Sequence, residues 1–188
     1  MFFRTHYYSE TMAFSTLALV FSLAVGSFLT SAEKPTLDQL KEALNTKDKV
    51  WMLKRSYTNA ERICVYSEMD SLVGDYYTFD QSYMEGGKQE GPNRLYALLS
   101  TKKGEPVMTV SKKNGSTTGI DYTLMYWNTN EKCAVLTLQQ GSKCEQYAWD
   151  SHISDDRTMC DEKFSALCGG VTTDVYRQEC KTSTVAKS

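Results

Sequence analysis

The sequence predicts an all-β domain built from eight antiparallel strands. From Val50 to Asp150, apolar and aromatic residues alternate with polar ones at the period of two that is typical of half-buried strands. Turn residues separate the alternating segments, and no helix-length insertion lies between them, which argues against parallel βαβ units. Eight strands with short hairpin connections indicate an up-and-down barrel or a sandwich.

The predicted strands share β-branched and aromatic residues and are bounded by Gly, Pro and Asn. They cover Trp51–Tyr57, Ile63–Tyr66, Asp75–Phe79, Arg94–Ser100, Pro106–Ser111, Thr117–Trp127, Lys132–Leu138 and Lys143–Trp149. Asn114-Gly115 predicts a type I′ hairpin turn, because this pair accepts positive φ angles at low cost. Asn114 also begins the only Asn-x-Ser/Thr sequon, so we expect it to carry a glycan on an exposed tip.

A short helix is predicted before the strands. Thr36 and Gln39 have the spacing of a capping box, and Leu37, Leu40 and Leu44 then fall on one face.

A second helix is predicted after the strands, from Thr158 to Cys168. Thr158 or Asp156 is expected to cap its N-terminus, and Gly169 and Gly170 to end it. We expect its apolar positions Phe164, Leu167 and Cys168 to pack on the outside of a barrel.

The first 32 residues have the composition of a secretory signal peptide. Arg4 and His6 precede an apolar run from Met12 to Phe28, and small residues follow up to Ala32. We therefore predict residues 1–32 as the signal peptide and 33–188 as one secreted, extracellular domain, a monomer with no membrane segment after cleavage. The net charge of −2 gives no indication of a basic surface for nucleic acid.

Six cysteines lie in residues 33–188, at positions 64, 133, 144, 160, 168 and 180. An even number behind a secretion signal predicts three disulfides. Cys160 and Cys168 share the second helix at a rise of roughly 12 Å, which is too far for a bond. Cys133 and Cys144 lie at unequal distances from their hairpin turn, so we expect the helix cysteines to bond to strand cysteines.

No pattern of catalytic residues is present, so we predict that the protein is not an enzyme. His152 is the only histidine after residue 32, and it lies in a polar stretch typical of an exposed loop. The chain has no Gly-x-Ser-x-Gly, no phosphate-binding loop and no Cys-x-x-Cys. Neither a metal ion nor a cofactor is expected.

Aromatic residues are frequent on the predicted strands, with twelve tyrosines in the chain. Side chains with apolar rings and polar tips are typical of small-molecule cavities. At each single position, the alternative is that the aromatic side chain packs in a solid core and lines no cavity. The candidate ligand-binding aromatics are Trp51, Tyr57, Phe79, Tyr122, Tyr147 and Trp149.

Several segments together resemble the tick salivary lipocalins, the histamine-binding family. These segments are Trp51–Tyr57, Cys64–Tyr66, Tyr126–Val135, Cys144–Trp149, Cys160–Phe164, Leu167–Gly169 and Val175–Tyr176, with Cys180 at the end. The resemblance implies an eight-stranded lipocalin barrel, with a short N-terminal helix and a C-terminal helix packed outside. It further implies the disulfides Cys64–Cys180, Cys133–Cys160 and Cys144–Cys168.

The resemblance also implies a function: sequestering a small host mediator, either a biogenic amine such as histamine or serotonin, or an eicosanoid such as a leukotriene. A buried amine requires carboxylates beside aromatic faces. At the positions matching three acids of the histamine binders, however, this chain has Ala60, Ala134 and Tyr147. This loss of negative charge favours a lipid mediator.

Three charged residues are further candidates for the ligand site. Asp121 supplies a carboxylate if a register shift turns it inward, and Glu145 shares a face with Tyr147 and Trp149; the alternative for each is a surface acid. Arg55 alternates with Trp51 and Tyr57, so an inward guanidinium would bind a lipid carboxylate. Alternatively, Arg55 lies at the barrel mouth or forms an ion pair with Asp121.

A different class of function is also open, namely a salivary protein that binds a host protein, such as a complement component or a protease, through its surface. Exposed flat aromatics and an interior filled by its own side chains would favour that reading.

Overall fold

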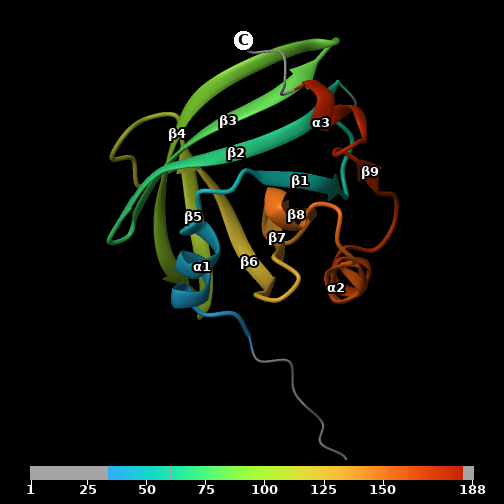
Figure 1. Cartoon of the computed structure of the whole chain (residues 1–188). Helices are drawn as coiled ribbons and strands as arrows, with labels where there is room; N and C mark the ends of the chain where they lie inside the picture. The colour runs from blue at the N-terminus through green and yellow to red at the C-terminus, as the bar shows by residue number, and fades with distance from the viewer. Residues whose placement is uncertain (1–33, 60, 184–188) are drawn as a thin grey trace, which may run out of the picture. The chain divides into compact units, whose positions relative to one another are not determined.

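Eight strands form one closed antiparallel sheet in the computed structural model, which describes residues 34–59 and 61–183 (Figure 1). Each strand pairs with the next along the chain, and β1 pairs with both β2 and β8, which closes the barrel. The strands are β1 Val50–Arg55, β2 Arg62–Val73, β3 Tyr76–Glu85, β4 Lys88–Lys102, β5 Glu105–Ser111, β6 Ile120–Asn128, β7 Cys133–Leu138 and β8 Lys143–Trp149. The prediction of an eight-stranded up-and-down barrel is confirmed. The proposed signal peptide, residues 1–32, lies outside the described residues.

Strands β2, β3 and β4 are longer than predicted. β2 continues past Tyr66 to Val73, and β3 continues past Phe79 to Glu85. The added residues are mostly polar and half-exposed, so their alternation is weak in the sequence. They are held by the antiparallel ladder between neighbouring strands, which needs backbone groups and not apolar side chains.

Helix α1, Leu37–Leu44, begins with the predicted capping box. Gln39 donates its backbone N–H to Thr36 Oγ1 (3.2 Å), and the Thr36 N–H is bonded to Gln39 Oε1 (2.9 Å). The helix packs against β4, β5 and β6 and buries Leu40 and Ala43 in the barrel core. It therefore covers the end of the barrel where β1 begins.

Helix α2, Thr158–Cys168, packs outside the barrel against β6, β7 and β8. Phe164 and Cys168 are buried as predicted, but Leu167 is 43% exposed. The predicted N-cap is wrong: Arg157 occupies that position and makes no side-chain capping bond, and neither Thr158 nor Asp156 replaces it. The carboxylate of Glu131 caps the helix from the turn between β6 and β7 instead.

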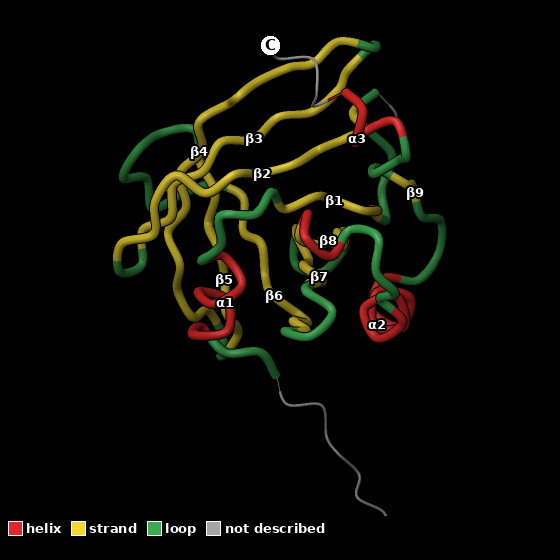
Figure 2. Tube along the Cα trace, viewed as in Figure 1, coloured by secondary structure: helices red, strands yellow, loops and turns green. Residues whose placement is uncertain are grey.

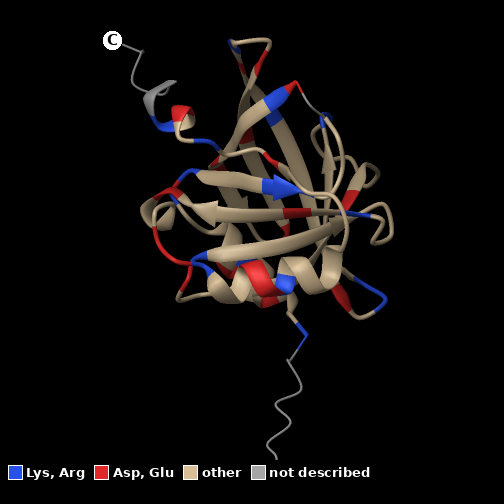
Figure 3. Cartoon of the chain, turned by 90° about the vertical axis from the view of Figure 1, so that its right-hand side faces the viewer, with Lys and Arg blue, Asp and Glu red and all other residues tan. Residues whose placement is uncertain are grey.

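The remaining elements are short and lie near the barrel surface (Figure 2). They are the 3-10 turn η1, Asp150–His152, strand β9, Thr173–Asp174, which pairs with β1, and helix α3, Glu179–Ser183. Within residues 34–59 and 61–183, no helix has the length and apolar character needed to cross a membrane. Basic and acidic residues are interspersed on the face seen in Figure 3 and are not separated by sign.

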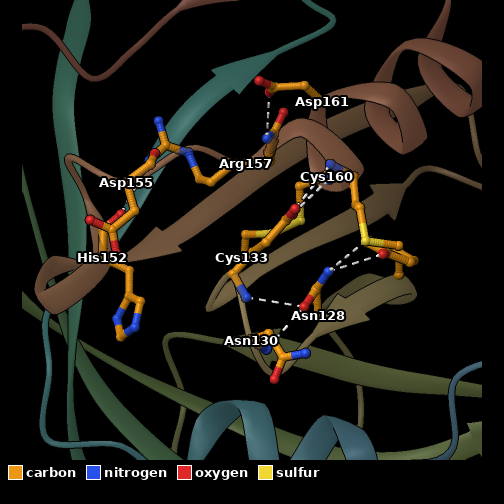
Figure 4. Close-up of a disulfide and its surroundings, with 12 residues drawn as sticks. Asn128, Asn130, Cys133, His152, Asp155, Arg157, Cys160 and Asp161 are labelled. Carbon is orange, nitrogen blue, oxygen red and sulfur yellow. Dashed lines mark hydrogen bonds between the residues drawn. A yellow bond between two sulfur atoms is a disulfide. The ribbon is translucent and has the colours of Figure 1, made fainter.

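Three disulfides join the later elements to the barrel. Cys64 on β2 bonds to Cys180 on α3, and Cys144 on β8 bonds to Cys168 on α2. The third, Cys133 on β7 to Cys160 on α2, is drawn with its surroundings in Figure 4. These are the pairs that the family resemblance implies.

The loop between β5 and β6 differs from its prediction. Only Gly115 of the Asn114-Gly115 pair has a positive φ (71°), whereas a type I′ turn needs positive φ at both residues. The chain instead makes a wider loop over residues 112–119, and Asn114 is exposed on it. The return to β6 brings Gly119 so close to β5 that a Cβ there would lie 2.1 Å from the carbonyl oxygen of Val110.

Candidate ligand-binding cavity

The barrel encloses a cavity of about 460 Å³, within the range of small-molecule sites. Most of its wall is apolar or aromatic. These wall residues are Leu40, Ala43, Leu44, Val50, Tyr77, Phe79, Leu95, Met108, Val110, Ile120, Tyr122, Leu124, Ala134, Leu136, Tyr147 and Trp149. The barrel interior therefore contains an open cavity and is not completely filled by side chains.

Four of the predicted ligand-binding aromatics line this cavity: Phe79, Tyr122, Tyr147 and Trp149. Tyr147 and Trp149 do so together because residues two apart on β8 face the same side. The ring of Phe79 stacks on that of Tyr77, with centroids 5.0 Å apart. Tyr77 also lines the cavity and was not singled out from the sequence.

Trp51 lies away from the cavity, contrary to the strict alternation expected for its strand. A register shift between Met52 and Lys54 interrupts the pairing of β1 with β8. Before that shift, Trp51 pairs with Ala148, which faces away from the cavity-lining Tyr147 and Trp149. Trp51 belongs to a second cluster, against Tyr66 and Tyr176 (centroids 4.8 and 5.1 Å), and its Nε1–H donates to Asp150 Oδ1 (2.7 Å). A single bulge of this kind reverses which residues share a face.

Arg55 is buried, with 2% of its surface exposed, but it does not line the cavity. Its guanidinium donates to the backbone oxygens of Asn59 and Arg62 (2.9 Å to Arg62) and lies 5.5 Å from the Tyr57 ring. It does not pair with Asp121. Arg55 thus holds the connection between β1 and β2 in place.

Asp121 lies on the outer surface, where its carboxylate binds Lys102 Nζ (2.7 Å) and accepts a hydrogen bond from Thr109 Oγ1 (2.6 Å). Partial burial acts to raise the pKa of Asp121, but the hydrogen bonds from Lys102 and Thr109 hold it below the usual value. No register shift turns this carboxylate inward.

Glu145 is almost fully buried, with 1% of its surface exposed. Its two carboxylate oxygens accept hydrogen bonds from the hydroxyls of Tyr57 and Tyr147. Burial raises the pKa of Glu145 despite these hydrogen bonds and the charges of Arg55 and Lys143. Burial and the neighbouring Glu145 also raise the pKa of Tyr57. Of this cluster only Tyr147 reaches the cavity wall.

Polar residues in the cavity wall include two cations that the sequence reasoning missed, Arg62 and Lys112. Arg62 opens β2 and Lys112 follows β5, so both lie at the same end of an up-and-down barrel, opposite α1. The Arg62 guanidinium lies 4.3 Å from the Tyr83 ring, and its Nε–H donates to Glu85 (3.1 Å). Arg62 is the first residue of β2, and the alternation of polar and apolar residues along this strand does not indicate whether its side chain points inward or outward.

No carboxylate lines the cavity among the described residues. Ala134 and Tyr147, two of the positions matched to acids of the histamine binders, are in the wall, so their lack of charge leaves this part of the cavity uncharged. The third, Ala60, lies outside the described residues.

The polar groups near His152 are not arranged for nucleophilic catalysis. Ser151 Oγ donates to Asp48 and lies 2.8 Å from His152 Nδ1, so the serine stands between the acid and the imidazole. In a Ser-His-Asp triad the histidine occupies that middle position. The nearby Glu131, Cys133 and Cys160 form no thiolate metal site, because the two cysteines are disulfide-bonded.

A closed eight-stranded up-and-down barrel around an apolar cavity is the structure of a lipocalin, a class of small-ligand binding proteins. Residues 30–182 match the family described as tick histamine-binding protein. The chain belongs to that family.

Solved structures with the same fold include two ligand complexes. Japanin from Rhipicephalus appendiculatus, bound to cholesterol, is 12% identical with a TM-score of 0.54; the match covers 73% of this chain and 97% of japanin. The serotonin complex of AM182 is 19% identical with a TM-score of 0.52, over 71% of this chain and 85% of that one. A search of curated protein sequences gave no significant match.

Proposed function

We propose that this protein is a secreted salivary lipocalin that captures a small host mediator in its barrel and so suppresses host inflammation and haemostasis. The mediator belongs to one of two classes, a biogenic amine such as histamine or serotonin, or an eicosanoid such as a leukotriene. The observation that carries this proposal is the apolar, aromatic-lined cavity of about 460 Å³. Binding of this kind requires no cofactor.

Relatives support capture of a small molecule but differ in the ligand. The family takes its name from histamine, whereas the two solved neighbours hold cholesterol and serotonin.

The charges in the cavity wall favour the eicosanoid. An ammonium removed from water needs a carboxylate partner, and none lines the cavity among the described residues. Lys112 lines the end opposite α1, together with Arg62, which is also ion-paired with Glu85. The carboxylate of a lipid would bind there, beside Lys112. The lipid chain would then extend along the apolar wall toward Leu40 and Leu44.

Secretion is part of the proposal and has two supports. Residues 1–32 have the order of a signal peptide, and three disulfides are typical of an oxidising compartment. The alternative function, binding a host protein through the surface, is less well supported because the interior is not filled by its own side chains.

Calorimetric titration of refolded residues 33–188 with histamine, serotonin and a leukotriene tests the function. We expect the leukotriene to bind at one site and the two amines to bind much more weakly. Tighter binding of an amine would overturn the assignment of the ligand class, and no binding of any of the three would favour the surface-binding alternative.

Lys112→Gln and Lys113→Gln provide a matched pair of variants for the same titration. Both residues lie in the loop after β5, but only Lys112 lines the cavity. Loss of one charge-assisted hydrogen bond is expected to weaken leukotriene binding by about tenfold in Lys112→Gln and to leave Lys113→Gln like the wild type. Equal effects of the two substitutions would contradict the proposed place of the carboxylate.

A further inference from the structure

A buried carboxylate lies just behind the cavity wall. Glu145 faces Leu136 across the β7–β8 ladder, and Tyr147 faces Ala134; both partners line the cavity. Glu145 therefore points toward the interior side of β8, as Tyr147 does. Yet Tyr147 lines the cavity and Glu145 does not.

The tyrosines account for this difference. The Tyr147 hydroxyl donates to Glu145 Oε2, and the Tyr57 hydroxyl donates to Oε1. Each carboxylate oxygen thereby accepts one hydrogen bond, and Tyr147 is at once a partner of the carboxylate and a residue of the cavity wall. The wall that a ligand meets at this point is an aromatic ring and not a negative charge.

Positive groups beside the cluster offset part of the cost of burying the carboxylate. Arg55 is the cross-strand partner of Glu145. Arg55 Cζ and Lys143 Nζ lie 5.5 and 4.8 Å from the Tyr57 ring. An unpaired buried carboxylate would be very costly, but this one has two hydroxyl donors and two nearby cations.

We propose that Tyr147 determines the charge specificity of the cavity, because its side chain covers Glu145 and thereby prevents the binding of organic cations. A smaller residue at position 147 opens the Glu145 carboxylate to the cavity and creates a site for a primary ammonium. This inference rests on the proposed function, since it takes the cavity as the ligand site.

The physical basis is the cost of moving an ammonium from water into an apolar cavity. That cost is prohibitive without a carboxylate or several acceptors. In the wild-type wall Tyr147 offers no negative charge, and its hydroxyl proton is directed at Glu145. Removing the ring supplies both a space and a charged acceptor beside it.

The test compares 2-phenylethylamine, which is a cation at neutral pH, with the uncharged 2-phenylethanol of the same size, by calorimetry. In Tyr147→Ala we expect the cation to bind about tenfold to hundredfold more tightly than in the wild type, the range of one charge-assisted hydrogen bond. The double variant Tyr147→Ala/Glu145→Gln should lose this gain. The alcohol should bind both variants alike.

Two further variants keep the test decisive. Tyr57→Phe removes the other phenol donor but leaves Tyr147 in place, so it should gain no affinity for the cation. Tyr147→Val is a strand-compatible replacement in case the alanine variant does not fold. If neither variant folds, Tyr147 is a structural residue and the proposal is wrong.

Three other outcomes would overturn the inference: no gain for the cation in a folded Tyr147 variant, a gain that survives Glu145→Gln, or an equal gain in Tyr57→Phe. Failure of the proposed function would look different. In that case neither 2-phenylethanol nor a lipid would bind the wild type or any variant.

Discussion

The carboxylate of Glu131 caps helix α2, to which the strand after it is disulfide-bonded: Glu131 Oε2 lies 3.1 Å from the backbone nitrogen of Cys160. Oε1 lies equally far from the backbone nitrogen of Met159. Glu131 precedes β7, and Cys133 on that strand is bonded to Cys160 (Figure 4). The first turn of α2 is thus held by a covalent bond and by a negative charge at its positive end.

Glu131→Ala should therefore destabilise the protein. It leaves two backbone N–H groups of α2 without acceptors and removes a favourable charge, so we expect the free energy of unfolding to fall by about 1–2 kcal/mol in urea titrations. Glu162→Ala, an exposed acid on the same helix, is the control and should cost much less. Equal losses would show that the capping contact contributes nothing specific.

The pH dependence of stability should report the burial of Glu145. Burial raises its folded pKa above 4.5, the value of a solvated glutamate. The folded state then binds this proton more tightly than the unfolded state, so the contribution of Glu145 to the free energy of unfolding decreases as pH rises from 4.5 through the raised pKa.

Glu145→Gln cannot titrate, so the stability of the wild type minus that of the variant should decrease as pH rises. Urea unfolding at intervals from about pH 4 to 8 measures this difference. A difference that is constant with pH, or one that increases, would contradict the raised pKa of Glu145.

The three disulfides should differ in their contribution to stability according to the chain length that each closes. Cys64 and Cys180 are 116 residues apart, and Cys144 and Cys168 are 24 apart. The chain-entropy estimate gives about 5 and about 3.5 kcal/mol for these two bonds. Replacing each pair by alanines and measuring urea unfolding should give the larger loss for Cys64–Cys180. The reverse order would contradict this account.

Asn114 is exposed on the loop between β5 and β6, so it should accept a glycan when the full chain is secreted from eukaryotic cells. We expect the secreted protein to lose mass on treatment with peptide-N-glycosidase, and the Asn114→Gln variant not to change. A wild-type mass that equals that of the bare polypeptide would show that the sequon is not used.

Alternation and turn residues predicted the strand number and order, because each hairpin is a local feature of the chain. The bulge after Met52 was not predictable, since it depends on how β1 pairs with β8, nearly a hundred residues later. The cap of α2 was missed for the same reason. Local sequence offered Thr158 and Asp156, whereas the donors of α2 are bonded to Glu131 from another turn.

The cavity was predicted in part. Phe79, Tyr122, Tyr147 and Trp149 line it, whereas Trp51 does not, because it pairs with Ala148 on the face of β8 opposite Tyr147 and Trp149. Arg62 and Lys112 were missed since charges at strand ends are usually solvated. Their place in the wall depends on barrel closure, which brings distant strand ends together.

The cavity itself is most directly tested by filling it. Ala134 is 2% exposed and lines the cavity, so Ala134→Phe should place a ring in the ligand space. Leukotriene titration by calorimetry should give one-site binding to the wild type and no measurable binding to the variant, with both proteins folded by circular dichroism. Equal binding by the two proteins would contradict capture inside the barrel.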